Sequence, residues 1–375
     1  MPINVLPPMF VQDGLPATSQ AAIREFNDRY LAAIGAAKPT GWADVLGDMI
    51  PTDRPEVTFP MSQLRTFYQK STGENRTKKL IEKSFDVKTQ EFDDGYEAKK
   101  MDLMLKVFAY RRWLEAPSRL VRAEEQHRHV QIAAILDGTG NRGGAVNSAN
   151  DPGGVGRACV DGTNFFGSTH PANLTDPTVA SPITGATTWS NYQSVATNVL
   201  GSQAVKNTGV FMIDNLMKEV MNMQLQVLDE NGFLFGANPD TLVVPQDYYE
   251  PVLNMLANAR MFQLVTNGTS NDVAAAALEN IYKGRFNVVP AKEFTTVTGS
   301  TADWYLIDSK MIRGEGISPW LCLRQTVDQS LALRVYDEST DYFRDTGNLK
   351  LSSHIWYGFS LVLPHAIRRI VGPTR

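Results

Sequence analysis

Residues 159–171, CVDGTNFFGSTHP, are the most distinctive stretch of this 375-residue chain. Asp161, Ser168 and His170 lie close together there, and Cys159 stands just before them. A hydrolase uses such side chains, but a catalytic triad is normally assembled from distant segments, and no GxSxG elbow surrounds Ser168. Nothing in the sequence marks Cys159 as an activated thiol. A cysteine or serine hydrolase therefore stays an alternative, and we expect no catalytic residue.

The rest of the chain lacks the signatures of common cofactor and metal sites. It contains no GxxxxGK[ST] phosphate loop and no GxGxxG after a predicted strand. The glycine-rich loop 138–156 has no lysine at the required place and opens no clear helix. His127 and His129 are two residues apart on a predicted helix, so they point about 200° apart and cannot share one metal ion. We expect no enzyme, no cofactor and no metal site.

The bulk composition indicates an ordinary globular protein with a sizeable core. The chain is 43% hydrophobic, and its net charge of -4 does not favour nucleic-acid binding. Its two cysteines exclude a disulfide framework. The sequence opens without a signal peptide, and no apolar run approaches the roughly 20 residues that span a bilayer. We expect synthesis in the cytoplasm and no membrane association.

The N-terminal region is expected to extend away from the core. Residues 1–17 hold four prolines and predict an extended arm. Thr18 and Ser19 are both good N-caps, so a helix is predicted to begin there. Ile23, Phe26 and Tyr30 then follow at helical spacing and predict a buried stripe that must pack on another element.

Residues 57–95 are predicted to form a thin, polar hairpin. Phe85, Val87 and Thr89 alternate with polar residues, which predicts a half-buried strand. Asp93-Asp94-Gly95 predicts a turn after it. An isolated hairpin is marginal in water, so this one is expected to gain stability by lying on a neighbour.

The remainder predicts a mixed α+β fold. A helical pattern from Tyr96 is interrupted at Pro117, where a second helix, 118–136, is expected to start. A compact α-β-α-α-β-β layer follows. Its predicted elements are a helix at 207–229, a strand at 241–245, a helix at 246–258, an alanine-rich helix from Asp272 to Tyr282, and strands at 286–289 and 304–307.

Several stretches resemble the Mu-like major head subunit family, capsid proteins with the Hong Kong 97-type fold, and they follow one another along the chain in the family's order. The pattern DG-x-x-FF-x-x-x-HP in 159–171 carries most of the resemblance. The others are similar to the family's acidic turn, its P-x-x-LVVP strand, its late paired strands and its closing strand. They are Phe92-Asp93-Asp94-Gly95-Tyr96, residues 238–245, residues 284–289 with 304–307, and Tyr357-Gly358 with Pro364.

The resemblance implies an α+β subunit of four parts. These are an N-terminal arm, an extended loop, a peripheral domain with a long spine helix at 118–136, and an axial domain that meets the symmetry axes. The expected boundaries are 1–56 for the arm, 57–95 for the loop, 96–200 with 346–375 for the peripheral domain, and 201–345 for the axial domain.

The resemblance implies structural roles, and no catalytic ones, for the residues of the motifs. Phe165 and Phe166 become aromatic anchors buried under the spine helix, next to a turn at Asp161-Gly162. The candidates for structure and assembly are Asp93, Asp94, Gly95, Asp161, Gly162, Phe165, Phe166, His170 and Pro171.

The function implied is that of a major capsid protein of a tailed bacteriophage or prophage. Copies would associate as hexamers and pentamers into an icosahedral shell around double-stranded DNA, without sequence-specific contacts to it. Portal, scaffolding and decoration proteins are expected partners, and the protein is expected in the virion after synthesis in the host cytoplasm. The alternative shell is an encapsulin-like compartment.

Overall fold

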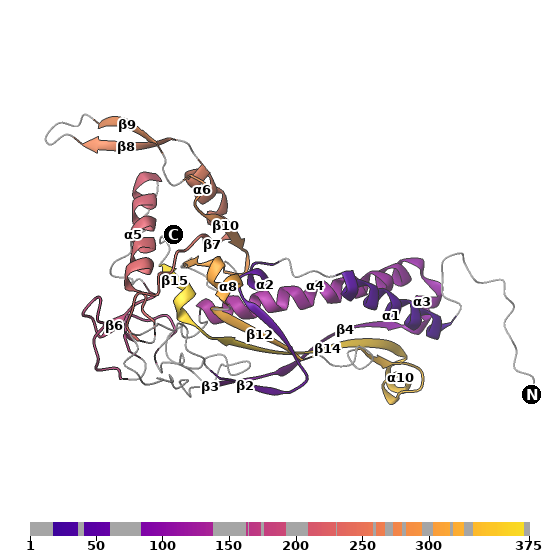
Figure 1. The fold of residues 1–375 in the computed structure, drawn as a ribbon. Coiled ribbons are helices and arrows are strands. Elements are labelled where there is room, and N and C mark those ends of the chain that lie inside the picture. Colours follow the sequence, from indigo (N-terminus) through magenta and orange to yellow (C-terminus); the bar gives the residue numbers. More distant parts are fainter. Residues whose placement is uncertain are drawn as a thin grey trace, which may run out of the picture.

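A computed structural model gives the fold of most of the chain (Figure 1). It describes residues 18–36, 41–60, 84–137, 163, 165–173, 176–192, 209–229, 231–257, 260–266, 273–279, 283–294, 303–315, 318–325 and 333–370. The mixture of helices and sheets confirms the α+β class. No helix in these ranges is long and apolar enough to cross a membrane.

One long helix, α4 (Val107–Asp137), runs along an elongated body (Figure 1). Its 31 residues span about 45 Å at the usual helical rise. Helix α1 (Ser19–Ala36) packs along its first half, and Trp113 of α4 contacts Phe26 of α1 with ring centroids 5.0 Å apart. Thr18 caps α1, because its Oγ1 accepts a hydrogen bond from Ala21 N at 3.1 Å. The predicted start of this helix is confirmed.

The first sheet lies along α4 and is organised by the 14-residue strand β14 (Asn348–Leu361) (Figure 1). Leu349 and Leu351 of this strand are buried in one core with Phe26, Tyr30 and Trp113. The other members are β1 (Asp48–Thr52), β4 (Gln90–Lys99), β12 (Trp320–Gln325) and β13 (Leu333–Tyr336).

The second sheet forms the other end of the body and holds the larger core. Its order is β10-β7-β11-β15, with β7 and β10 parallel. Every residue of β7, β11 and β15 is buried. Helices α5 and α6 stand beside it (Figure 1). The bounds are β7 (Thr241–Pro245), β10 (Asn287–Ala291), β11 (Trp304–Ile307), β15 (Ile367–Ile370), α5 (Gly209–Gln226) and α6 (Gln246–Ala257).

Two hairpins leave the body. Strands β2 (Glu56–Pro60) and β3 (Ser84–Lys88) pair near the first sheet, and β8 (Arg260–Thr266) and β9 (Val273–Glu279) pair beyond the second. The strand predicted around Phe85 and Val87 is thus confirmed. The short remaining elements are α2 (Trp42–Val45), α3 (Lys100–Leu105), β5 (His170–Pro171), β6 (Thr188–Trp189), α8 (Ser309–Glu315), α10 (Asp341–Thr346) and a 3₁₀ turn (Pro364–Ala366).

Three local predictions are wrong. The expected break at Pro117 does not occur, since α4 continues through it; Trp113, Ala116 and Leu120 are buried on either side, and this packing holds the helix together despite the missing backbone donor. The alanine-rich helix is strand β9, because β8 offers a partner along its whole length.

The third wrong prediction is the turn at Asp93-Asp94-Gly95. These residues lie in the middle of β4, which pairs with β14 without interruption from Lys99 opposite Asn348 to Gln90 opposite Tyr357. Glycine at 95 serves close packing of the strands: a Cβ there would lie 2.7 Å from the carbonyl oxygen of Leu351.

Strand pairing links segments on the two sides of the expected boundary at residue 345. Strands β12 and β13, which precede that boundary, pair with β14 of the first sheet, whereas β15, which follows it, pairs with β11 of the second. The hairpin ends at Lys88, because β4 belongs to the first sheet.

Candidate functional site

The distinctive motif folds into a buried polar cluster at the short sheet β5–β6. His170 is fully buried, and its ring stacks on Trp189 with centroids 4.5 Å apart. Its Nδ1 lies 3.0 Å from Thr163 Oγ1, and its Nε2 lies 3.1 Å from Asn191 Oδ1. An amide oxygen can only accept, so Nε2 donates to Asn191 Oδ1.

Asn191 is the centre of this cluster. Its Oδ1 also accepts from Gly167 N at 3.0 Å, and its Nδ2 donates to the carbonyls of Phe165 at 2.8 Å and Pro364 at 3.3 Å. Its backbone donates to Gly167 O at 3.2 Å and accepts from Arg369 N at 2.9 Å. One fully buried side chain thus joins the motif to the last part of the chain.

This geometry does not assemble the hydrolase alternative. Ser168 is exposed, while both nitrogens of the buried His170 are engaged with Thr163 and Asn191. A general base needs a free ring nitrogen within reach of its nucleophile. Cys159, Asp161 and Gly162 lie outside the described residues. Cys322, the cysteine that is described, is buried.

The aromatic pair of the motif packs on the second sheet. The rings of Phe165 and Phe166 meet edge to face with centroids 4.9 Å apart, and Phe166 lies 5.7 Å from Tyr305 of β11. The guanidinium of Arg369 lies 5.8 Å from the centre of the Phe166 ring. Both phenylalanines share a core with the end of α4, but their ring contacts come from β11 and from each other.

The two arginines of β15 form buried ion pairs. Arg369 binds Asp303 through Nη2 and, at 2.8 Å, through Nε, and both side chains are 3% exposed. Arg368 Nε lies 2.5 Å from Glu219 Oε2 of α5. A basic pair at the surface would be available to phosphate groups, whereas each of these guanidinium groups is neutralised inside the subunit.

A third polar cluster joins α4 to the first sheet. Glu124 of α4 is buried, accepts a hydrogen bond from Tyr357 Oη, and lies 2.9 Å from Arg324 Nη2. Arg128 Nη1 donates to the same tyrosine oxygen at 3.2 Å. Burial, followed by the charge of Glu124, raises the pKa of Tyr357 above its ordinary value. The cluster fixes the long helix against β12 and β14.

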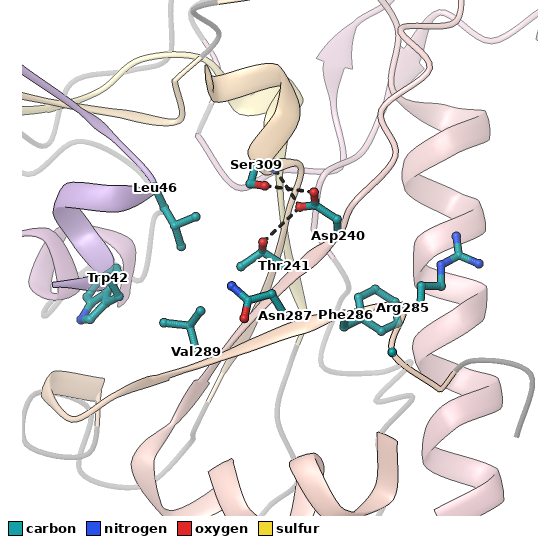
Figure 2. A pocket seen from close by; sticks show the side chains of 10 residues that line it. Trp42, Leu46, Asp240, Thr241, Arg285, Phe286, Asn287, Val289 and Ser309 are labelled. Atoms are coloured by element: carbon teal, nitrogen blue, oxygen red, sulfur yellow. Dashed lines mark hydrogen bonds between the residues drawn. The ribbon is translucent and has the colours of Figure 1, made fainter. Parts of the chain in front are cut away.

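The described residues also line a cavity of about 700 Å³ between α2 and the second sheet (Figure 2). Trp42 and Leu46 form one wall, and Thr241, Asn287 and Val289 face them from the sheet (Figure 2). At its rim the carboxylate of Asp240 accepts from Ser309 N at 3.0 Å, Ser309 Oγ at 2.9 Å and Thr241 Oγ1 at 3.0 Å.

These bonds engage the Asp240 carboxylate in positioning the start of α8. No group of three or more metal-binding side chains occurs among the described residues. The cavity combines apolar walls with a few polar groups and contains no pair of an acid and a base at working distance.

Sequence reasoning missed the residue that organises the motif. Asn191 stands in a loop-rich stretch and belongs to no recognised pattern, although Trp189 two positions before it is an aromatic residue of the kind that anchors loops to a core. The other candidates are separated from it: Asp93, Asp94 and Gly95 lie on β4 of the first sheet.

Comparisons with known proteins give similarities in structure alone. No protein-family model matches the chain, and no curated protein matches it. The procapsid of bacteriophage JBD30 has a TM-score of 0.47 and 11% identity, with 95% of this chain and 75% of that chain covered. The capsid of cyanophage P-SCSP1u has a TM-score of 0.45 and 10% identity, with coverages of 88% and 87%.

A virus-like particle from Pyrococcus furiosus has a TM-score of 0.42 and 7% identity, with coverages of 92% and 98%. By their descriptions, the three similar structures are a phage procapsid, a phage capsid and a virus-like particle. Because the TM-score is below 0.5 and the identity is 11% or lower in all three cases, they do not carry the function.

Proposed function

We propose that this chain is a major capsid protein of a tailed bacteriophage, which self-associates into an icosahedral shell around double-stranded DNA. The observation that carries the proposal is the β8–β9 hairpin, which extends from the end of the body (Figure 1). Among the described strands it pairs with no other sheet. A two-stranded hairpin is marginal in water unless something packs on it, and repeated copies of the same subunit would supply that cover.

The second hairpin supports the same function. At its base, Val87 of β3 packs on Leu321 and Leu323 of β12, so the direction in which the hairpin leaves the body is fixed. Residues 61–83, which join β2 to β3, belong to the proposed extended loop. Heterologous contacts that close produce rings, and many weak contacts of this kind add up to a stable shell.

The motif residues fit a folding role within each subunit. Phe165, Phe166 and His170 are buried in the isolated chain, so they would hold the second sheet in place and not contact a neighbour directly. Asp93 and Asp94 are exposed on β4 and are the candidates for contact between subunits. The charge of -4 and the internally paired arginines suit a shell that confines DNA without holding it.

The finer assignment is to the Mu-like head subunit family, with the Hong Kong 97-type division into arm, extended loop, peripheral domain around α4 and axial domain around the second sheet. The site of action is the virion, and the partners are further copies of the chain in hexamers and pentamers, with portal, scaffolding and decoration proteins. This assignment is supported by the motifs at 159–171 and 238–245.

The test is electron microscopy and sedimentation of the purified chain, alone and coexpressed with the scaffolding gene of its own genome if there is one. We expect shells, rings or tubes built from capsomers. A chain that stays monomeric at high concentration in both preparations would contradict the proposal. Nuclease-protected DNA inside native particles separates a viral head from an encapsulin-like compartment, which would carry protein instead.

A matched variant isolates the extended loop. Pro60 pairs with Ser84 at the end of the described hairpin, so residues 61–83 can be replaced by Asn-Gly, a pair that favours a two-residue turn. The body should fold as before. We expect monomers in place of particles, with an unchanged thermal midpoint.

A further inference from the structure

Three large apolar side chains are exposed where α3 meets α4. The exposed fractions are 62% for Met101, 60% for Leu105 and 80% for Phe108. We call these three residues the tip patch. Exposed apolar residues scattered singly are normal on protein surfaces, but a contiguous group marks a surface that something covers.

The three residues lie within eight positions of one another, where α3 ends and α4 begins. Met101 and Leu105 are four residues apart in α3, a spacing that places them on the same face. Phe108 follows in the first turn of α4, only three residues later. Leu103 and Tyr110 of the same segment point the other way, into the core shared with α1. The tip patch therefore lies opposite the face that α1 already covers.

The N-terminal segment enters the fold next to this patch. Ser19 Oγ and Lys100 Nζ both bind Oε1 of Glu338, the latter at 2.8 Å. The shared carboxylate places the first turn of α1 beside the first residue of α3. The chain that precedes Thr18 thus begins within a few residues' length of Met101.

We propose that residues 1–17 fold back and cover the tip patch of their own subunit. The segment, MPINVLPPMFVQDGLPA, holds Val5, Leu6, Met9, Phe10 and Val11 in one short stretch and a single charged residue, Asp13. Its composition thus complements an apolar surface. Its four prolines restrict the free segment, which lowers the entropy lost when it docks.

The lengths also agree. From Phe10 to Ala17 an extended chain reaches about 25 Å. Helix α3 has six residues and is about 9 Å long, so every residue of the tip patch is within this reach. The inference does not depend on the shell function. If shells form, residues 1–17 can leave the tip patch of their own subunit and bind the tip patch of a neighbouring subunit during assembly.

The test is a cross-link on the full-length monomer, isolated by size exclusion. The variant Phe10→Cys/Phe108→Cys is oxidised briefly, and the linked peptides are identified by mass, which separates them from links to Cys159 or Cys322. The control pair is Phe10→Cys/Met221→Cys, because Met221 is comparably exposed, at 53%, but lies on α5 at the far end of the body (Figure 1).

We expect a link within one chain for the first pair and none for the control. A link found only between two chains would overturn the proposal and assign the patch to a second copy, and links at equal yield in both pairs would overturn it as well. Hydrogen exchange on the unsubstituted protein provides a second measurement. Amides of 101–108 should exchange about tenfold faster when residues 1–17 are removed, whereas unchanged exchange contradicts docking.

Discussion

Oδ1 of Asn191 lies at hydrogen-bond distance, 3.1 Å, from Nε2 of His170, and both residues are fully buried. The same amide binds the backbone of Phe165, Gly167 and Pro364. Segments separated by about half of the chain are joined through one residue that carries no charge. A neutral hub of this kind satisfies several buried polar groups at once and avoids the desolvation cost of a buried ion.

Replacing this hub should destabilise the chain strongly. In Asn191→Ala, His170 Nε2 and the carbonyl oxygens of Phe165 and Pro364 lose this partner while they remain buried, and the half-buried Gly167 N loses it as well. We expect a loss of about 2–4 kcal/mol in the free energy of unfolding, the range for buried polar groups left unpaired. Denaturant unfolding of the unassembled chain measures it.

The matched control for this prediction is Asn238→Ala. The Asn238 side chain is exposed and accepts one hydrogen bond, from Gln224 at 2.9 Å. Its loss should cost less than about 0.5 kcal/mol. Equal effects of the two substitutions would show that Asn191 does not organise the motif.

The buried pair of Arg369 and Asp303 predicts a second large effect. Arg369→Met should destabilise the fold by about 3–5 kcal/mol, because Asp303 is left charged and buried. Arg369→Met/Asp303→Leu should recover a large part of this loss, since no unpaired charge remains. Thermal and denaturant unfolding of Arg369→Met, Asp303→Leu, the double variant and the parent give the coupling energy.

The exposed pair of Arg344 and Asp341 is the reference for that cycle. Its nitrogen and oxygen are 3.1 Å apart, but the side chains are 70% and 91% exposed. Arg344→Met should change stability by less than about 1 kcal/mol. A cost for Arg369→Met as small as this one would mean that water reaches the Asp303 carboxylate.

Local patterns predicted the elements whose own side chains decide their structure. The helical spacing of Phe26 and Tyr30 predicted α1, and the apolar run of β7 predicted a strand. Both patterns depend only on the burial of the residues that form them. The failures occurred where a distant partner decides. Gly95 has the appearance of a turn residue until β14 is placed beside it, and the alanines of β9 are neutral until β8 pairs with them.

The candidate site divides in the same way. Phe165 and Phe166 are recognisable as anchors because they are large and apolar. The role of Asn191 depends on carbonyl groups of segments far apart in the sequence, and Arg368 and Arg369 have the appearance of a surface cluster until Glu219 and Asp303 are found opposite them. Partner identity is a property of the fold and leaves no local signal in the sequence.

His127 predicts a loss of stability in mild acid. Burial and, after it, the charge of Arg128 lower the pKa of His127 below the ordinary 6.5, while Glu124 acts in the opposite direction. As the pH falls through 6.5, His127 takes up a proton in the unfolded chain but stays neutral in the folded chain. The contribution of His127 to the free energy of unfolding is therefore complete above this pH and decreases below it, until the pH reaches the pKa of His127 in the folded chain.

The variant His127→Phe should remove this part of the pH dependence. The ring lies between Phe92, at 4.3 Å, and Phe359, at 6.4 Å, and Nε2 is buried without a hydrogen-bond partner among the described residues. We expect the variant to gain stability relative to the parent between pH 7.5 and 5, as measured by thermal midpoints. Gln126→Ala, at the exposed neighbouring position, should keep a constant difference in thermal midpoint from the parent at every pH. If the difference between His127→Phe and the parent is also constant over this range, the assignment is refuted.

Gly358 fixes the position of the β2–β3 hairpin. A Cβ at this position of β14 would lie 2.5 Å from the carbonyl oxygen of Lys88 and 3.1 Å from a methyl group of Val87. The first neighbour is backbone and cannot rotate away, so Gly358→Ala must push β3 off β14. We expect a cost of about 1–3 kcal/mol, as for other overpacked sites, and faster hydrogen exchange in β3. Ser360→Ala, two positions along the same strand, removes one hydroxyl and should leave β3 exchange unchanged.

Because the hairpin base sets where residues 61–83 leave the body, Gly358→Ala should also lower particle yield, whereas Ser360→Ala should not. Normal stability and exchange in Gly358→Ala would show that the hairpin is not held by this close approach.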